Sequence, residues 1–151
     1  MNVLFSVVKF VHILSVITAV GSNITYGFWQ ARTGNLQEME SFVLRGVKWI
    51  DDHVANPAYG LVLITGLIMA AWRYSLTTHW IVAAIVLYAI AIGVALAVYS
   101  PALTRQIDVL EKDGIGSATY RQAATRATVV GIAVMVPILV IIFLMISRPS
   151  F

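Results

Sequence analysis

Two ionisable side chains, Lys9 and His12, lie three residues apart within an otherwise apolar stretch near the start of the chain. A spacing of three residues places both on one face of a helix. Ionisable groups are costly in hydrocarbon and are therefore candidates for a function. A neutral imidazole can ligate haem, relay a proton, transfer a metal, or form a hydrogen bond to Ser, Thr or Tyr across a helix interface. The residues alone leave these alternatives open for His12.

Lys9 also has two interpretations. Its long apolar stem lets the ammonium group reach the nearer membrane surface, which is the usual behaviour of such a residue. If the ammonium stays inside the protein, it would bind a haem propionate or keep His12 in the neutral form that ligates a metal.

The composition is that of a membrane protein. Of the 151 residues, 60% are hydrophobic and 11% are charged, and the mean hydropathy is +0.87. The net charge of +3 and the pI of 9.5 come from basic residues scattered between apolar stretches, which excludes a nucleic-acid interface. The absence of cysteine excludes disulfides and thiolate metal sites, and no other metal-ligand cluster is expected.

Four stretches are long and apolar enough to cross a bilayer, at about 3–28, 54–72, 80–100 and 124–147. They predict an all-α fold, with residues 1–151 forming one membrane domain built as an antiparallel bundle of four transmembrane helices. Seven basic residues fall in the two long loops, whereas only Arg73 and Arg148 fall on the other side. The positive-inside rule therefore places both loops in the cytoplasm and both termini outside.

The two long loops are predicted to contain amphipathic helical extensions of the spans. Apolar residues recur every three or four positions over residues 36–54, with charged residues between them. Asn56 and Pro57 either cap a separate helix or kink one long helix. A similar pattern follows the third span until Gly114, and Ser117 is a suitable cap for the fourth helix.

Small and polar residues recur at helical spacing in every span and are expected to face other helices. These interior faces are predicted to consist of His12, Ser15, Ala19, Ser22 and Tyr26 in the first span, Ala58, Val62, Thr65 and Met69 in the second, Ala84, Tyr88, Ala91 and Ala95 in the third, and Ala124, Thr128, Gly131 and Met135 in the fourth.

The helical rise of 1.5 Å per residue converts these positions into depths. His12, Thr65 and Tyr88 are each about 12 to 14 Å from the outer ends of their spans, and Met135 is about one turn deeper. We therefore expect Thr65 and Tyr88, and less closely Met135, to surround His12. His53 is about 20 Å away along the membrane normal and His79 about 14 Å away, so neither is placed to be a second axial ligand.

Three short motifs carry a family resemblance. The segment Lys9-Phe10-Val11-His12-Ile13-Leu14, followed by Gly21, resembles the opening helix of a group of small bacterial membrane proteins. That group includes the oxygen-independent protoporphyrinogen oxidase HemJ and the copper-resistance D membrane domain. Asn56-Pro57-Ala58 with Thr65-Gly66-Leu67 is similar to the second helix of the group. The ending Leu144-Met145-Ile146-Ser147-Arg148-Pro149 resembles that of an uncharacterised bacterial family of four-helix integral membrane proteins.

The resemblance implies a protein associated with haem or porphyrin, with His12 as the axial ligand of haem b. Two segments depart from the group: Ala19-Val20-Gly21-Ser22 replaces a Trp-x-Gly-Gly sequence, and Gln30-Ala31-Arg32-Thr33 replaces the arginine and histidine cluster of the oxidase. No catalytic triad or Gly-rich phosphate loop is present, and these observations favour a protein that is not an enzyme.

Together with the resemblance to bacterial families, the sequence predicts a small integral protein of the bacterial cytoplasmic (inner) membrane, surrounded by the lipid bilayer and associated with haem or porphyrin. One alternative is a structural or assembly subunit of a larger membrane complex or homo-oligomer. The further alternatives are a porphyrinogen oxidase and a metal-handling protein, although the five Met residues form no cluster that copper transport would favour.

Overall fold

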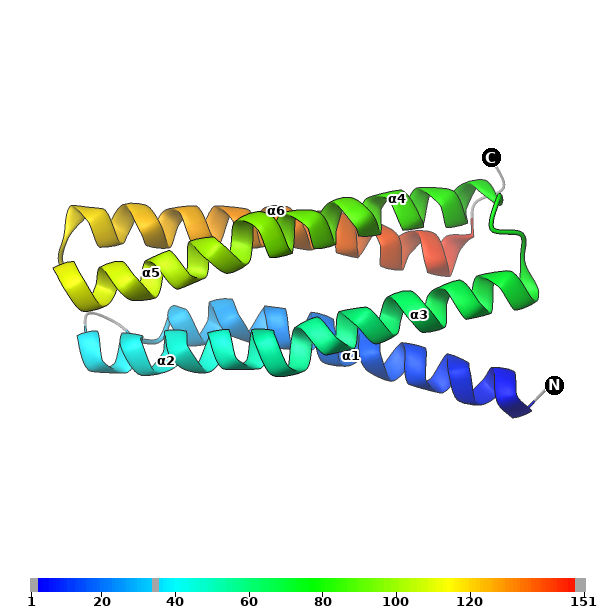
Figure 1. Cartoon of the computed structure of the whole chain (residues 1–151), viewed down its shortest axis with the longest axis horizontal. Coiled ribbons are helices and arrows are strands. Elements are labelled where there is room, and N and C mark those ends of the chain that lie inside the picture. Colours follow the sequence, from blue (N-terminus) through cyan, green and yellow to red (C-terminus); the bar gives the residue numbers. More distant parts are fainter. Residues whose placement is uncertain (1–2, 34–35, 149–151) are drawn as a thin grey trace. The chain divides into compact units, whose positions relative to one another are not determined.

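All regular secondary structure in residues 3–33 and 36–148 is helical, and these residues are the part of the chain that a computed structural model describes (Figure 1). Pro149 of the terminal motif lies outside these residues. The elements are α1 (Val3–Gln30), α2 (Gln37–Ile50), the π-helical turn η1 (Asp51–Ala55), α3 (Asn56–Arg73), α4 (His79–Val94), the π-helical turn η2 (Ala95–Tyr99), α5 (Ser100–Asp113) and α6 (Ala118–Ser147).

Four continuous helices are long and apolar enough to cross a membrane, which confirms the predicted number of spans. They are Val3–Gln30, Gln37–Arg73, His79–Asp113 and Ala118–Ser147. The second helix joins α2, η1 and α3, and the third joins α4, η2 and α5. Each predicted amphipathic extension therefore continues its span without an intervening loop. The side of the membrane on which the termini lie stays a prediction.

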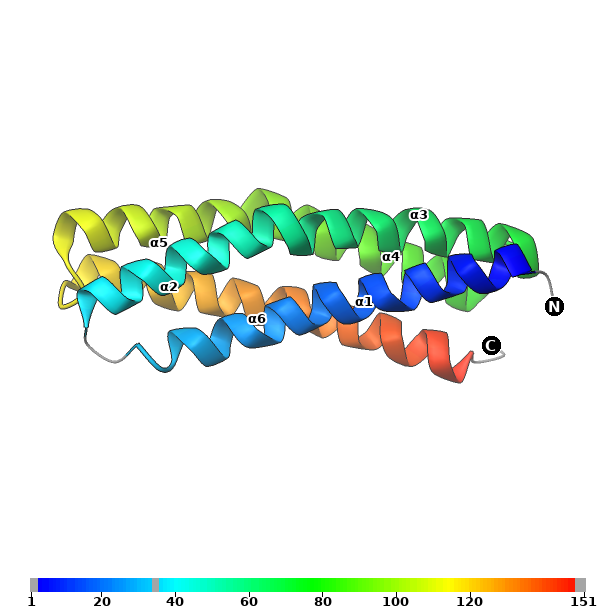
Figure 2. The same cartoon turned by 90° about the horizontal axis from the view of Figure 1, so that it is seen from below.

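The chain divides into two compact units, which we describe separately. Unit 1 comprises residues 1–32 and 45–76, and unit 2 comprises residues 33–44 and 77–151, so the boundary falls within α2. In unit 1, α1 runs antiparallel to α3 and packs against α3 and η1 (Figures 1 and 2). In unit 2, α6 runs antiparallel to α4 and α5 and packs along α4, η2 and α5.

Each π-helical turn ends directly before an X-Pro pair. The backbone N–H of Asn56 donates to the carbonyl of Asp51, and that of Ser100 donates to the carbonyl of Ala95, five residues back in both cases. A proline ring crowds the carbonyl four residues earlier, and a π turn, which holds an extra residue, gives that carbonyl room. The helix therefore runs through Pro57, and of the two predicted alternatives the continuous helix is observed.

The predicted interior faces are confirmed in part. Ser15, Ala19 and Tyr26 are buried in α1, as are Ala84 and Ala91 in α4. The prediction for the fourth span is confirmed at Gly131, where an added Cβ atom would lie 3.2 Å from the Tyr99 ring, and is wrong at Thr128.

In α6, Thr128 is exposed, and the buried side begins one position earlier in the helical register than predicted. It comprises Tyr120, Ala123, Ala127, Val134 and Ile138. Tyr120 sets this register, because its hydroxyl group hydrogen-bonds to Glu40 inside unit 2. The pattern of small residues in the apolar stretch could not reveal that contact, since Tyr120 lies outside the stretch.

The turn between α5 and α6 forms as predicted. The backbone of Gly114 has φ of 80°, a left-handed conformation that glycine adopts without steric cost, and its N–H donates to the carbonyl of Leu110 at 3.1 Å. Ser117 caps α6, since its hydroxyl oxygen accepts a hydrogen bond from the backbone N–H of Tyr120 at 3.1 Å.

Candidate functional site

His12 makes a side-chain hydrogen bond between two apolar helices. It is half-buried on α1, and its Nδ1 atom lies 2.9 Å from Oγ1 of Thr65 on α3. Thr65 is 7% exposed, so this contact lies within the packed face of unit 1. The shared depth predicted for His12 and Thr65 is confirmed by this hydrogen bond.

The partners of Thr65 determine which nitrogen of His12 carries the proton. The Thr65 hydroxyl group has one hydrogen, and it donates this hydrogen to the carbonyl of Leu61 at 2.5 Å, as threonines in helices commonly do. Oγ1 then accepts from His12, which requires the hydrogen of the imidazole to be on Nδ1. In the neutral ring with this tautomer, the lone pair is on Nε2.

Gly66 provides the space that the His12 ring occupies. A Cβ atom added to Gly66 would lie 3.2 Å from Cε1 and 3.7 Å from Nδ1 of His12. The first distance is shorter than an ordinary van der Waals contact, so any larger residue would push the ring away from its present position. The glycine and the threonine next to it thus define the position and the hydrogen bonding of one imidazole.

The other predicted neighbours of His12 differ in their placement. Lys9 is exposed on α1 and makes no hydrogen bond or ion pair with residues 3–33 or 36–148. Tyr88 and Met135 are half-buried on α4 and α6 of unit 2. Their proximity to His12 in unit 1 stays a prediction.

The two remaining histidines are exposed and lie at helix ends or turns. His53 is in η1, where its ring stacks on Trp49 with centroids 4.9 Å apart and its Nδ1 lies 3.0 Å from the Trp49 carbonyl. His79 is the first residue of α4 in unit 2. The His53 ring is thus engaged locally, consistent with its predicted exclusion as a second axial ligand.

Unit 1 contains a second interhelical hydrogen bond, which the sequence analysis missed. Nδ2 of Asn23 on α1 donates to the hydroxyl oxygen of Tyr59 on α3 at 2.5 Å. The available signal was an amide side chain inside an apolar span, because such groups bind other polar groups across helix interfaces. Asn23 and His12 therefore connect α1 to α3 at two separate depths.

A buried polar network in unit 2 was also missed. Glu40 is 5% exposed, and its Oε1 accepts a hydrogen bond from the Tyr120 hydroxyl group at 2.5 Å while its Oε2 accepts one from Thr33. Gln106, which is 1% exposed, donates from Nε2 to the Tyr120 hydroxyl oxygen at 3.4 Å. The sequence pattern placed Glu40 among the charged residues on the polar side of an amphipathic helix, so its burial was not predicted.

Over residues 3–33 and 36–148, no three His, Cys, Asp or Glu side chains are grouped as a protein-only metal site requires. A haem brings four equatorial nitrogens of its own and would need only an axial ligand from the protein. His12 lies between two apolar helices, with its Nδ1 hydrogen-bonded to Thr65.

Comparisons with known proteins identify a membrane family. A family model described as "Predicted integral membrane protein (DUF2269)" matches residues 6–149. No curated protein and no solved structure matches the chain at a significant level.

Proposed function

The chain belongs to this family of predicted integral membrane proteins, and we propose that it associates with haem or porphyrin through His12. The observation that carries the proposal is the hydrogen bond between Nδ1 of His12 and Oγ1 of Thr65, from which we infer the tautomer. Nδ1–H donates to Thr65, whose own hydrogen goes to Leu61, and this arrangement leaves the Nε2 lone pair as the donor for iron.

This pattern of contacts supports the proposal, because it is compatible with a metal-ligating histidine. Such histidines usually donate their second ring N–H to a fixed acceptor, which sets the tautomer and the ring orientation and makes the ligating nitrogen more basic. Thr65 supplies that acceptor, and Gly66 supplies the space for the ring. When bound, the haem would contribute the redox or ligand-binding chemistry, and the protein would hold it and determine its environment.

Further support comes from the resemblance of the first helix to that of the HemJ oxidase and the copper-resistance D membrane domain. Lys9 is one turn from His12 on α1, is exposed and has no partner among the described residues, so its ammonium group is available to a haem propionate. The departures from the oxidase motifs favour a non-catalytic, haem-associated protein over an oxidase.

A pyridine haemochrome spectrum of the detergent-purified protein, expressed with haem precursors, tests this proposal. We expect the wild-type protein to carry haem b and His12→Ala to lose it. His79→Ala is the matched control, because it removes an exposed histidine at the start of α4. It should retain the wild-type haem content.

A colourless wild-type preparation would contradict the proposal, as would a His12→Ala variant with unchanged haem content. Either result would favour the alternative of a structural or assembly subunit, in which His12 serves only to connect α1 with α3. Gentle co-purification followed by native mass spectrometry would then identify the complex.

A further inference from the structure

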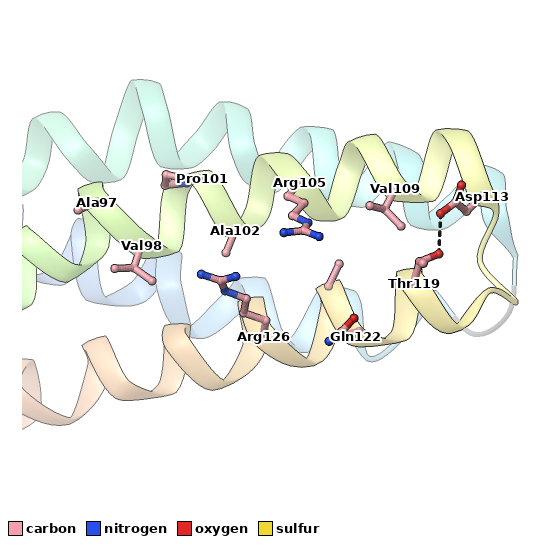
Figure 3. Close-up of a pocket in the computed structure, with 11 residues that line it drawn as sticks. Ala97, Val98, Pro101, Ala102, Arg105, Val109, Asp113, Thr119, Gln122 and Arg126 are labelled. Carbon is pink, nitrogen blue, oxygen red and sulfur yellow. Dashed lines mark hydrogen bonds between the residues drawn. The ribbon is translucent and has the colours of Figure 1, made fainter.

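Unit 2 contains a cavity of about 480 Å³ between the continuous helix α4–η2–α5 and α6 (Figure 3). Its lining changes in character along the helix axis. Ala97, Val98 and Pro101 form one end, and Asp113 and Thr119 lie at the other. The cavity thus has an apolar end and a polar end.

Two arginines extend into this cavity from opposite helices. Arg105 reaches from α5 toward α6, and Arg126 reaches from α6 toward α5 (Figure 3). Neither guanidinium group forms a hydrogen bond or an ion pair with residues 3–33 or 36–148. The lining carboxylate, Asp113, lies at the far end, two helical turns beyond Arg105, where it accepts a hydrogen bond from Thr119 at 2.6 Å.

Arg105 and Arg126 are both exposed, and the mutual repulsion of their guanidinium groups is relieved when an anion binds between them. Guanidinium groups are suited to phosphate oxygens, because their planar N–H donors match the geometry of such oxygens. The electrostatics therefore indicate a phosphate group between Arg105 and Arg126.

The position of the cavity along the helices identifies the source of the phosphate. Arg126 directly precedes the long apolar stretch of α6, and Ala97 and Val98 belong to the apolar stretch of the preceding helix. The arginines therefore lie where the hydrocarbon region gives way to the headgroup region, which is about 5 to 7 Å thick on each side of a bilayer. An occupant at this level has its charged part near the arginines and its apolar part beside Ala97 and Val98.

We propose that this cavity binds an anionic glycerophospholipid, with its phosphate between Arg105 and Arg126 and the start of an acyl chain along Ala97 and Val98. Basic pockets between membrane helices recognise anionic headgroups by this chemistry. Zwitterionic lipids are disfavoured, because their ammonium group would add a further positive charge near Arg105 and Arg126.

Lipid titration of the full-length protein, followed by native mass spectrometry from mild detergent, tests the proposal. Phosphatidylglycerol is compared with phosphatidylcholine of the same acyl chains. We expect Arg105→Gln and Arg126→Gln each to weaken phosphatidylglycerol binding about fivefold. Arg121→Gln is the matched control, because it removes an exposed arginine of α6 that does not line the cavity. It should bind as the wild type does.

Circular dichroism and a single elution peak establish that each variant is folded, and Arg126→Lys, which keeps the charge, should retain most of the binding. Equal affinity for the two lipids would overturn the proposal. So would an equal loss of binding in Arg121→Gln. Displacement of phosphatidylglycerol by millimolar inorganic phosphate would show that the cavity is a site for free phosphate, which would also overturn the lipid assignment.

Discussion

The two units bury polar side chains in different surroundings. In unit 1, His12 and Thr65 meet between two apolar helices, and one hydrogen bond joins them. In unit 2, Glu40 and Tyr120 meet where the helices carry many charged residues, and both carboxylate oxygens of Glu40 accept hydrogen bonds. The unit 1 pair is a single side-chain hydrogen bond to one ring nitrogen, whereas both carboxylate oxygens of Glu40 in the unit 2 network accept hydrogen bonds.

Under the proposed function, this difference corresponds to a binding role for His12 and a structural role for Glu40. A buried carboxylate with two hydrogen bonds fixes the positions of its partners, and removing it leaves those partners unsatisfied. A hydrogen bond through Nδ1 fixes the orientation of the histidine ring. The lone pair of Nε2 can still ligate a metal. We therefore expect mutations in the unit 2 network to act on stability and mutations around His12 to act on ligand binding.

The largest effect on stability is expected for Glu40→Ala. It removes the acceptor of the Tyr120 hydroxyl group, which is 6% exposed, and one partner of Thr33. An unsatisfied buried group costs about 1 to 3 kcal/mol, so the free energy of unfolding should fall by about that amount. Denaturant titration in detergent micelles measures it. Glu38→Ala, an exposed neighbour on the same helix, should change stability by less than about 0.5 kcal/mol; equal losses in both variants would show that the network is not structural.

The second prediction concerns Thr65→Val, which keeps the shape of the side chain and removes the acceptor of His12 Nδ1–H. If His12 ligates haem, the affinity of the apoprotein for haem should fall about 10- to 100-fold, because the ring loses its fixed tautomer and orientation. Haem titration followed by absorbance measures it. Thr18→Val is the control, since the hydroxyl group of Thr18 donates to the carbonyl of Leu14 within α1. An unchanged affinity in Thr65→Val would contradict the orienting role.

The smallest effect is expected for Gly66→Ala compared with Gly60→Ala on the same helix. A Cβ atom at position 66 would lie 3.2 Å from the His12 ring, whereas one at position 60 would have no atom within 4 Å. Gly60→Ala should gain about 0.5 to 1 kcal/mol from helix propensity, and Gly66→Ala should lose that gain through the displaced ring. The two free energies of unfolding should therefore differ by about 1 kcal/mol; indistinguishable values would show that the His12 ring is free to move.

Much of the fold could be predicted because it depends on local chemistry. The four spans follow from the lengths of the apolar stretches, the end of α5 follows from Gly114, and the start of α6 follows from Ser117. The pairing of His12 with Thr65 also followed, because the constant rise of a helix converts a residue number into a depth. These inferences needed only distances along one helix.

The contacts that sequence reasoning missed all depend on rotation about a helix axis or on a partner distant in sequence. Glu40 and Tyr120 are 80 positions apart, and no periodicity in either helix shows that they meet. The interior side of α6 was predicted one position out of register. The rotation of α6 about its own axis depends on the contact of Tyr120, which lies outside the apolar stretch used for the prediction. The two π-helical turns were also missed, since Asn56-Pro57 and Ser100-Pro101 are compatible with a break, a kink or a widened turn.

The sequence by itself determined that this is a four-span helical membrane protein, with His12 at the depth of Thr65, because hydropathy and helical rise act on each segment alone. Only the tertiary structure decided that the Thr65 hydroxyl group accepts from Nδ1, that Gly66 makes room for the ring, and that Arg105 and Arg126 face one cavity. Hydrogen-bond direction, side-chain clearance and charge proximity depend on the packing of two helices against each other, and neither helix encodes that packing alone.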